Sequence, residues 1–306
     1  MLNERIARGV GPDKIDIAWE ERGDRKNPTV LLVMGLAAQL VHWPGGFLDA
    51  LLSRGLHLVR FDNRDAGHST HMKGAPPPDM AAAMKGDLSS ASYTLSHMAS
   101  DAVGLLDALE IDSAHVVGAS MGGDIAQTIA IEHPNRVRSL TSMMSTTGAP
   151  TVGQPDPETL KRLFAEPPAR TREEVIARAV RSSQLLSSPK FPANPAAIAE
   201  TAGLAYDRDY DEMAIARQGL ATLASGDRTE RLRAITVPAL VWHGLADKMR
   251  DASGGRATAA AIPGAELVLI EGQGHDLPPA LWDTIADHIV EVVRKGEAQR
   301  EARSKS

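Results

Sequence analysis

The chain has 306 residues, of which 43% are hydrophobic and 24% charged, a balance typical of a globular protein large enough to bury a sizeable core. Its net charge of −6 argues against a nucleic-acid partner, because binding to phosphates requires a basic surface. The absence of cysteine excludes disulfide bonds, a thiol nucleophile and cysteine-ligated zinc.

The sequence carries no signal for a membrane. Its first residues include acidic side chains and lack the apolar segment of a signal peptide, and no run of about 18 apolar residues occurs. We therefore expect a cytoplasmic protein without a membrane partner. The basic segment 294–305 is expected to be a solvated end. The oligomeric state stays open, and a homodimer is one option.

The first half of the chain alternates apolar β-type runs with helical patterns. Strands are predicted at 15–19, 29–33, 56–61, 114–118 and 137–144. Helices are predicted at 47–53, at 95–109 and after residue 120, and the Pro-containing stretch 70–92 is predicted to be a surface loop. This alternation implies a mostly parallel sheet covered by helices.

The pattern changes between residues 149 and 236, which are poor in strands. Helices are predicted there at 157–164, 171–186, 195–202 and 210–225. The alternation then resumes with a strand at 237–242, a helix ending at residue 261, a strand at 266–270 and a helix at 281–295. We therefore predict a core formed by 1–148 and 237–306, with 149–236 inserted between its halves as a helical cap.

A Gly-x-Ser-x-Gly sequence centred on Ser120 lies between the strand 114–118 and the following helix. A serine on such a strand-to-helix turn has its hydroxyl exposed above the sheet, where it can act as a nucleophile. Side chains at Gly118 and Gly122 would collide across the turn, and Gly123 lets the helix pack closely on its strand.

A serine hydroxyl needs a base to accept its proton and a third group to orient that base. Asp247 follows the strand 237–242 and His275 follows the next strand, so both lie at carboxyl ends of strands, where the functional groups of open α/β sheets gather. We predict that His275 is the base and Asp247 the orienting acid.

Other residues are candidates for these two roles. Asp251 is a rival acid four residues after Asp247, while the acidic stretch 207–212 is expected to be a solvated face of the cap. His243 is expected to be structural, and His42, His68 and His71 are expected to provide polar lining in loops near the site.

A tetrahedral intermediate needs two N–H donors for its negative charge. We predict the backbone N–H of Met121, which begins the helix after Ser120, and that of Leu36, which follows Gly35 in the loop after the strand 29–33. Met34, Met143 and Met144 are predicted, with these two residues, to line an apolar substrate pocket.

These motifs resemble the α/β-hydrolase superfamily over most of the chain, and in particular its branch containing aclacinomycin methylesterase. The resemblance is carried by the segments 118–123, 62–69, 243–247 and 272–275, together with 33–35 and 43–44. It implies an eight-stranded, mostly parallel sheet, a helical cap, and Ser120, Asp247 and His275 as a catalytic triad. The chain departs from many members in having Met34 where they have histidine and Asp65 where they have glycine.

The predicted function is hydrolysis of an apolar, small-molecule carboxylic ester through an acyl-enzyme intermediate, without a cofactor. No metal site is predicted, because no histidine and carboxylate pair recurs at ligand spacing with a third ligand at a strand end. The alternatives are lactone or C–C bond hydrolysis and acyl transfer by the same triad, and a non-enzymatic binding protein. A proline-iminopeptidase-like aminopeptidase is a further alternative, and its acidic amine-binding residue would be Glu200, Asp207 or Asp211.

Overall fold

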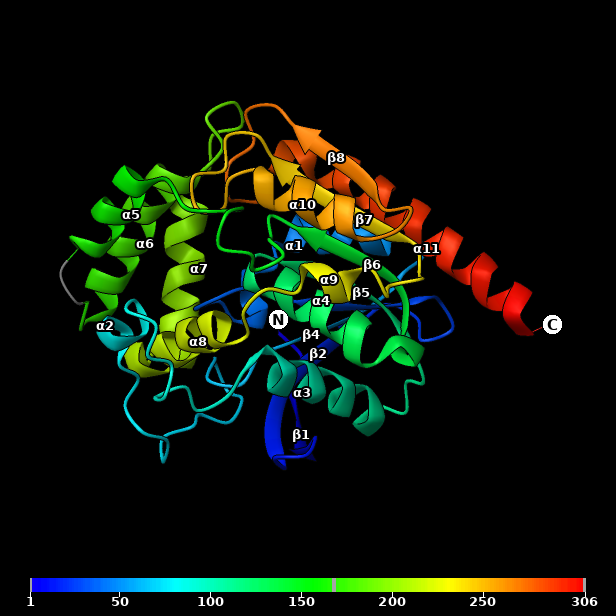
Figure 1. Cartoon of the computed structure of the whole chain (residues 1–306), viewed down its shortest axis with the longest axis horizontal. Coiled ribbons are helices and arrows are strands. Elements are labelled where there is room, and N and C mark those ends of the chain that lie inside the picture. The colour runs from blue at the N-terminus through cyan, green and yellow to red at the C-terminus, as the bar shows by residue number, and fades with distance from the viewer. Residues whose placement is uncertain (1, 167–168, 305–306) are drawn as a thin grey trace.

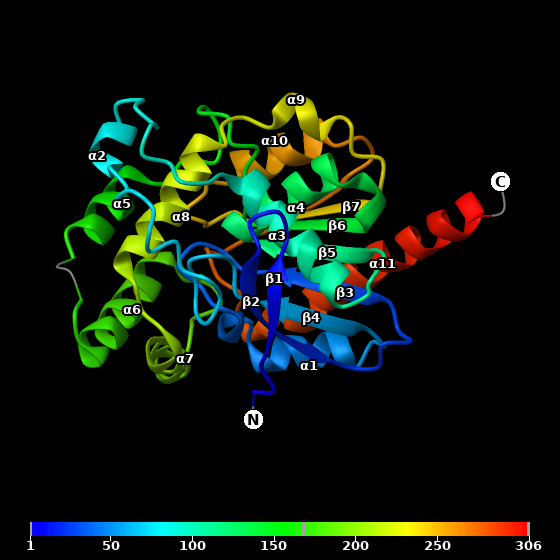
Figure 2. The ribbon, with the colours of Figure 1, turned by 90° about the horizontal axis from the view of Figure 1, so that it is seen from below.

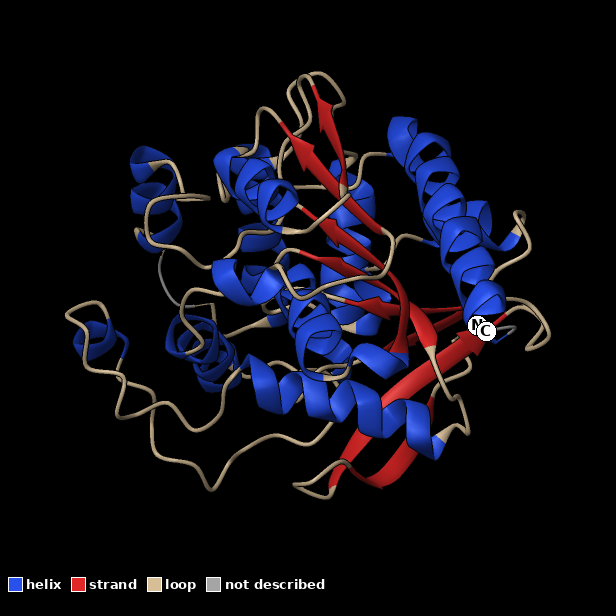
Figure 3. Cartoon of the chain, turned by 45° about the vertical axis from the view of Figure 1, so that its right-hand side comes forward, coloured by secondary structure: helices blue, strands red, loops and turns tan. Residues whose placement is uncertain are grey.

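The computed structural model describes residues 2–166 and 169–304. An eight-stranded sheet lies between two layers of helices (Figures 1 and 3), with the strand order β1-β2-β4-β3-β5-β6-β7-β8. The strands β1 and β2 pair antiparallel, β2 pairs antiparallel with β4, and the remaining neighbours are parallel. The predicted fold class, including the eight strands, is confirmed. The strands are β1 (Arg5–Val10), β2 (Ile15–Arg22), β3 (Thr29–Val33), β4 (His57–Phe61), β5 (Ala114–Ala119), β6 (Val137–Met143), β7 (Ala239–Gly244) and β8 (Glu266–Ile270).

The central strands are apolar because both of their faces are covered. Every residue of β3 and β5 is buried. Successive side chains of a strand point to opposite faces, so Leu31 and Val33 belong to one core cluster while Val30 and Leu32 belong to the other. The helices α3 (Leu95–Ala108), α4 (Met121–Glu132) and α10 (Ser253–Ala261) pack on the first face, and α1 (Gly45–Leu52) and α11 (Trp282–Ser304) on the second.

Five helices of the described residues lie between β6 and β7, in the segment predicted as a cap, and we call the first four of them the cap. They are α5 (Pro157–Phe164), α6 (Arg172–Leu186), α7 (Pro195–Arg208) and α8 (Glu212–Ala224). They gather on the left of Figures 1 and 2 beside the short helix α2 (Met80–Ala83), whereas α11 extends away on the right. A fifth short helix, α9 (Thr229–Leu232), leads back into the core.

The structure differs from the sequence prediction at several elements. The stretch 70–92, predicted to be a loop, contains the short helix α2. The strand β1 is absent from the prediction because it is an edge strand in which only Val10 is buried, so it has no apolar run. The helix α7 continues to Arg208, beyond the predicted end at residue 202. The segment after residue 294 stays helical to Ser304, and Glu297 in it contacts His115 and Arg138 of the sheet.

No described helix combines the length and the apolar character needed to cross a lipid bilayer.

The contact between α1 and α11 gives a test of the fold. A Cβ atom at Gly46 would lie 2.1 Å from Cζ3 of Trp282, whereas one at the neighbouring Gly45 would meet nothing within 4 Å. The indole cannot move freely, because its Nε1 donates a hydrogen bond to the carbonyl of Leu277 at 2.8 Å. We expect Gly46→Ala to lower the free energy of unfolding by about 1–3 kcal/mol. Gly45→Ala is the matched control and should be neutral or stabilising in urea titrations; equal effects of the two variants would contradict the packing described.

Candidate active site

Ser120 lies on a sharp turn between β5 and α4, in a backbone conformation with φ of 57° and ψ of −124° that few non-glycine residues adopt. Its N–H donates to the carbonyl of Met143 at 2.9 Å. A Cβ atom at Gly118 would lie 2.0 Å from the carbonyl oxygen of Gly122, and one at Gly122 would lie 2.0 Å from that of Val33. The glycines are therefore required by the close approach of the chain around the serine.

The structure brings Ser120, His275 and Asp247 together. Nε2 of His275 lies 3.0 Å from Oγ of Ser120, and Nδ1 lies 2.7 Å from Oδ2 of Asp247. The histidine and the aspartate occupy the loops after β8 and β7, whose carboxyl ends meet at one edge of the sheet. The two hydrogen bonds orient the imidazole toward the hydroxyl.

Asp247 is fully buried and is held as a carboxylate by its neighbours. Its Oδ1 accepts hydrogen bonds from the N–H groups of Met249 and Arg250 at 2.9 and 2.8 Å, so Oδ2 faces His275. Burial raises the pKa of Asp247, but the charge and hydrogen bond of His275, the Arg250 N–H and His243 together hold that pKa below its ordinary value.

The predicted oxyanion donors lie around the serine. A Cβ atom at Gly35 would lie 3.1 Å from Cβ of Ser120, so the loop carrying Leu36 runs directly against the nucleophile. Met121 is the first residue of α4, where the N–H has no partner within the helix. The N–H of Leu36 makes no hydrogen bond to another described residue. Both amides are thus available to an oxyanion.

The His275 loop is held by the chain that leaves the cap helix α6. The N–H of His275 donates to the carbonyl of Leu186 at 2.8 Å, and the N–H of Gly274 donates to Oγ of Ser188 at 2.9 Å. Ser188 also donates from Oγ to Oδ1 of Asp276 at 2.5 Å and from N to Oδ2 at 3.2 Å. The position of the imidazole therefore depends on the cap as well as on the sheet.

A family model described as the alpha/beta hydrolase fold matches residues 28–278. This chain belongs to the α/β-hydrolase family. It is 28% identical over 299 residues to rhodomycin D methylesterase of Streptomyces peucetius, covering 91% of this chain and 95% of that protein. It is 30% identical over 176 residues, 56% of this chain and 59% of the relative, to a 2-hydroxy-6-oxononadienedioate/2-hydroxy-6-oxononatrienedioate hydrolase of Dechloromonas aromatica.

Among solved structures, the enol-lactonase of Burkholderia xenovorans LB400 is similar, with a TM-score of 0.71 at 24% identity. The similarity covers 95% of this chain and all of that protein, and it shows the shared fold. The resemblance inferred from the sequence motifs is thereby confirmed at the level of the family.

Two of the cavities lined by described residues lie between the cap and the core, one near His275 and one beside it. The larger, which we call the apolar chamber, has a volume of about 570 Å³ and is lined by His275 and largely by apolar groups, including Trp43, Ile198, Leu277 and Trp282. The smaller, which we call the polar pocket, has a volume of about 190 Å³ and is lined by Gln39, His42, Asp65, His71, Arg178 and Tyr210 among others.

The three methionines predicted as substrate contacts lie in the core. Met34, Met143 and Met144 are buried in the cluster on the α1 and α11 face, and none of them lines either cavity. The backbone carbonyl of Met34 accepts a hydrogen bond from Nδ2 of Asn63 at 2.9 Å, and this bond positions the chain at the end of β3.

The other candidate histidines and acids have identifiable contacts. His243 is buried with its Nε2 2.8 Å from the carbonyl of Arg250, so it supports the loop of Asp247. His42 and His71 line the polar pocket, whereas His68 is partly exposed and contacts Glu4. Asp251 accepts from the N–H of Ser253 and is exposed.

Three contacts that hold the site are not predicted by the sequence. The carboxylate of Asp65 accepts two hydrogen bonds from Arg217 of α8 at 2.9 and 2.8 Å, which explains the aspartate at this position. Gln218 of the same helix accepts a hydrogen bond from the N–H of Ala37, next to the predicted donor Leu36. Asp124 in α4 pairs with Arg250, which lies three residues after Asp247. Of these three contacts, only that of Asp65 has a signal in the sequence, which is an aspartate where many family members have glycine.

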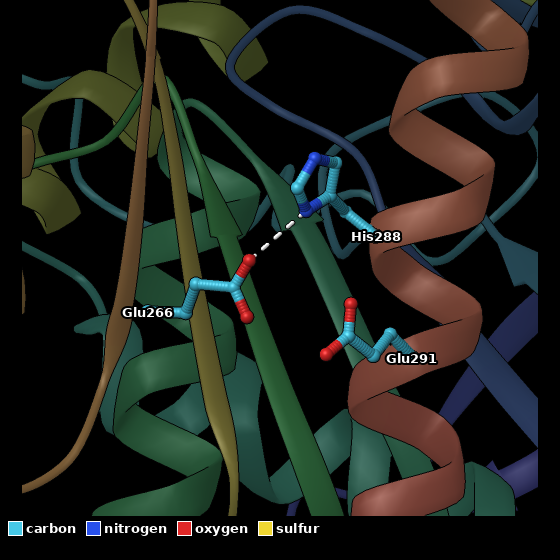
Figure 4. Close-up of side chains that lie close together, drawn as sticks. All are labelled: Glu266, His288 and Glu291. Atoms are coloured by element: carbon cyan, nitrogen blue, oxygen red, sulfur yellow. Dashed lines mark hydrogen bonds and ion pairs between the residues drawn. The ribbon is translucent and has the colours of Figure 1, made fainter.

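One group of potential metal ligands occurs among the described residues, on β8 and α11 (Figure 4). Glu266, His288 and Glu291 each offer an atom within 4.8 Å of the others. However, Nζ of Lys295 lies 3.2 Å from Glu266 and 2.9 Å from Glu291, so an ammonium group already balances these carboxylates. Glu266 begins β8, whereas His275 follows its end, and we assign no metal to this group.

The contacts of Ser188 lead to a prediction about the His275 loop. Ser188→Ala removes the hydroxyl that joins Gly274 to Asp276 and leaves a buried N–H and carboxylate without that partner. We expect the kcat for ester hydrolysis to fall about tenfold with little change in KM, since an unmade buried hydrogen bond costs about 1–3 kcal/mol. Ser188→Thr, which keeps the hydroxyl, should restore most of the loss.

Ser187→Ala is the matched control, because the side chain of Ser187 makes no hydrogen bond to a described residue. The measurement is kcat and KM for each variant together with the pH profile of kcat. A Ser188→Ala enzyme that is less stable but has unchanged kcat would show that the residue only supports the fold.

Proposed function

We propose that this hydrolase cleaves carboxylic esters, with Ser120 as nucleophile, His275 as general base and acid, and Asp247 as the acid that orients the imidazole. The observation that carries the proposal is the pair of hydrogen bonds made by His275, to Ser120 Oγ at 3.0 Å and to Asp247 at 2.7 Å. Nucleophile, base and orienting acid in this geometry are what acyl transfer to a serine requires.

In the acylation step, Nε2 of His275 accepts the proton of Ser120 while Oγ attacks the ester carbonyl. The N–H groups of Leu36 and Met121 stabilise the oxyanion that forms. The imidazolium, stabilised by Asp247, then gives its proton to the leaving alcohol. In deacylation His275 accepts a proton from water, which attacks the acyl-enzyme and releases the carboxylic acid. These steps require no cofactor.

The pairing of the acidic side chains in the cap favours an ester substrate over a peptide with a free amino terminus. Asp207 is paired with Arg172 at 2.7 Å, and Asp211 accepts hydrogen bonds from the first turn of α8 at 2.9 and 3.2 Å. Glu200 lines the apolar chamber but is exposed at its edge. Asp276, which also lines the chamber, accepts two hydrogen bonds from Ser188. The methylesterase relative, aligned over 91% of this chain, supports the same choice.

The other acyl-transfer reactions remain alternatives that differ in the bond cleaved. A lactone is an internal ester and could be opened by the same steps, whereas C–C cleavage requires a proton at carbon. The proposed substrate is an uncharged, small-molecule carboxylic ester. The cytoplasmic location and the oligomeric state stay predictions from the sequence.

The test is a substrate panel with Ser120→Ala as reference. We expect the wild type to hydrolyse p-nitrophenyl and methyl esters, and to leave aminoacyl anilides intact. Ser120→Ala should lower kcat by about 10⁶, by analogy with the effect of removing a serine nucleophile in a serine protease. Labelling with a fluorophosphonate, measured by mass spectrometry, should occur at Ser120 alone. Turnover of anilides with inert esters, or equal turnover by Ser120→Ala, would contradict the proposal.

A further inference from the structure

His42 lies where the two cavities beneath the cap meet. It lines both the apolar chamber and the polar pocket, together with Ala179 of α6 and Ala202 of α7. The apolar chamber also reaches His275. Two imidazoles therefore line one cavity, that of His275 beside Ser120 and that of His42, and the mechanism above uses only the first.

The ring of His42 is fixed by the short helical turn Leu40–His42. The N–H of Gln39 donates to Nδ1 of His42 at 2.9 Å, so Nδ1 is an acceptor and the neutral ring carries its hydrogen on Nε2. Gln39 is itself held, because its Nε2 donates to the carbonyls of Ala205 and Asp209 at 2.9 and 2.8 Å. The cap thereby sets the tautomer and orientation of His42.

The Nε2 atom of His42 has no hydrogen-bond partner among the described residues. It is also not one of the buried polar atoms that lack a partner, so it is open to the cavities that the ring lines. Burial lowers the pKa of His42 to about 4, against the effect of the Gln39 carbonyl, and Arg208 lowers it further. At neutral pH the ring is therefore an uncharged donor.

We propose that His42 is a specificity-determining residue that donates its Nε2–H to an oxygen atom of the substrate. That oxygen is a carbonyl, ether or hydroxyl group on a bulky, uncharged part of the ester, bound in the apolar chamber. The inference rests on the proposed ester hydrolysis and adds the substrate class: aromatic or alicyclic esters bearing an oxygen acceptor remote from the scissile bond.

The chamber has the size and chemistry for such a group. Its volume of about 570 Å³ is that of a pocket for a ligand of several rings. Trp43 and Trp282 supply flat apolar surface, and Asp276, which also lines the chamber, is engaged by Ser188. The polar residues Ser183, Ser187, Asn194 and Thr201 also line this largely apolar chamber, but the ring of His42 is held in one orientation by Gln39. A fixed donor discriminates between substrates, because a substrate without an acceptor leaves it unpaired.

The experiment compares pairs of methyl esters that differ by one oxygen: fluorenone carboxylates and the corresponding fluorene carboxylates, in all positional isomers. For at least one isomer, the wild type should favour the ketone by about threefold to tenfold in kcat/KM, the range of one net hydrogen bond. His42→Phe should abolish this preference, and His42→Gln, which keeps a donor, should restore part of it.

Val41→Ala is the matched control, since Val41 lines the same chamber without a polar group, and it should keep the ketone preference. The rate of p-nitrophenyl acetate hydrolysis, a substrate too small to fill the chamber, is measured for every variant as the reference for its catalytic machinery. A wild type without any ketone preference, or a preference that persists in His42→Phe, would overturn the role of His42 while leaving ester hydrolysis intact. Failure of every ester would instead overturn the proposed function.

Discussion

Among the described residues, three buried ion pairs join the cap and the segment that follows it to two loop residues and one helix residue of the core. They are Arg208 with Asp62, Arg217 with Asp65, and Arg228 with Asp124, and every one of these side chains is at most 5% exposed. Removing one member of such a pair leaves a buried charge without its partner, which costs about 3–5 kcal/mol. The pairs contribute specificity more than net stability, because burying the charges is itself costly. They define one docked position of α7 and α8, and a cap held in this way does not open along that side as a free lid.

The same pairs reach the residues proposed for chemistry. Asp124 contacts Arg228 and also Arg250, whose N–H fixes the carboxylate of Asp247. Arg208 contacts Gln39, which sets the ring of His42. On the opposite side of the site, Ser188 joins the end of α6 to the His275 loop. The cap thus contributes to the geometry of the acid, the base and the chamber, and docking it completes the site.

The sequence predicts those parts of the fold and the site that are marked by a pattern among neighbouring residues. Apolar runs and their alternation with helices locate seven of the eight strands, and the convergence of strand ends places Ser120, Asp247 and His275 near one another. The contacts that it does not predict join residues far apart in the chain: Asp65 and Arg217 are separated by 152 positions, and Ser188 and Asp276 by 88. No periodicity marks such pairs. The pocket role of the three methionines stays a prediction. Their side chains are buried in the core, and a one-dimensional pattern does not say which face of a strand end a side chain occupies.

The turn around Ser120 and the apolar chamber differ in how strongly the backbone constrains their residues. The turn around Ser120 is tightly constrained, because a Cβ atom at Gly118 or Gly122 would lie only 2.0 Å from a backbone oxygen, so this chain needs glycine at both positions. The chamber has no comparable constraint. Its walls come from α6, α7, the turn before α1, the loop after β8 and the start of α11, and the proposed donor His42 lies on the turn before α1. A change in any of these walls alters the substrate without disturbing the triad, which is how one fold serves ester, lactone and C–C chemistry.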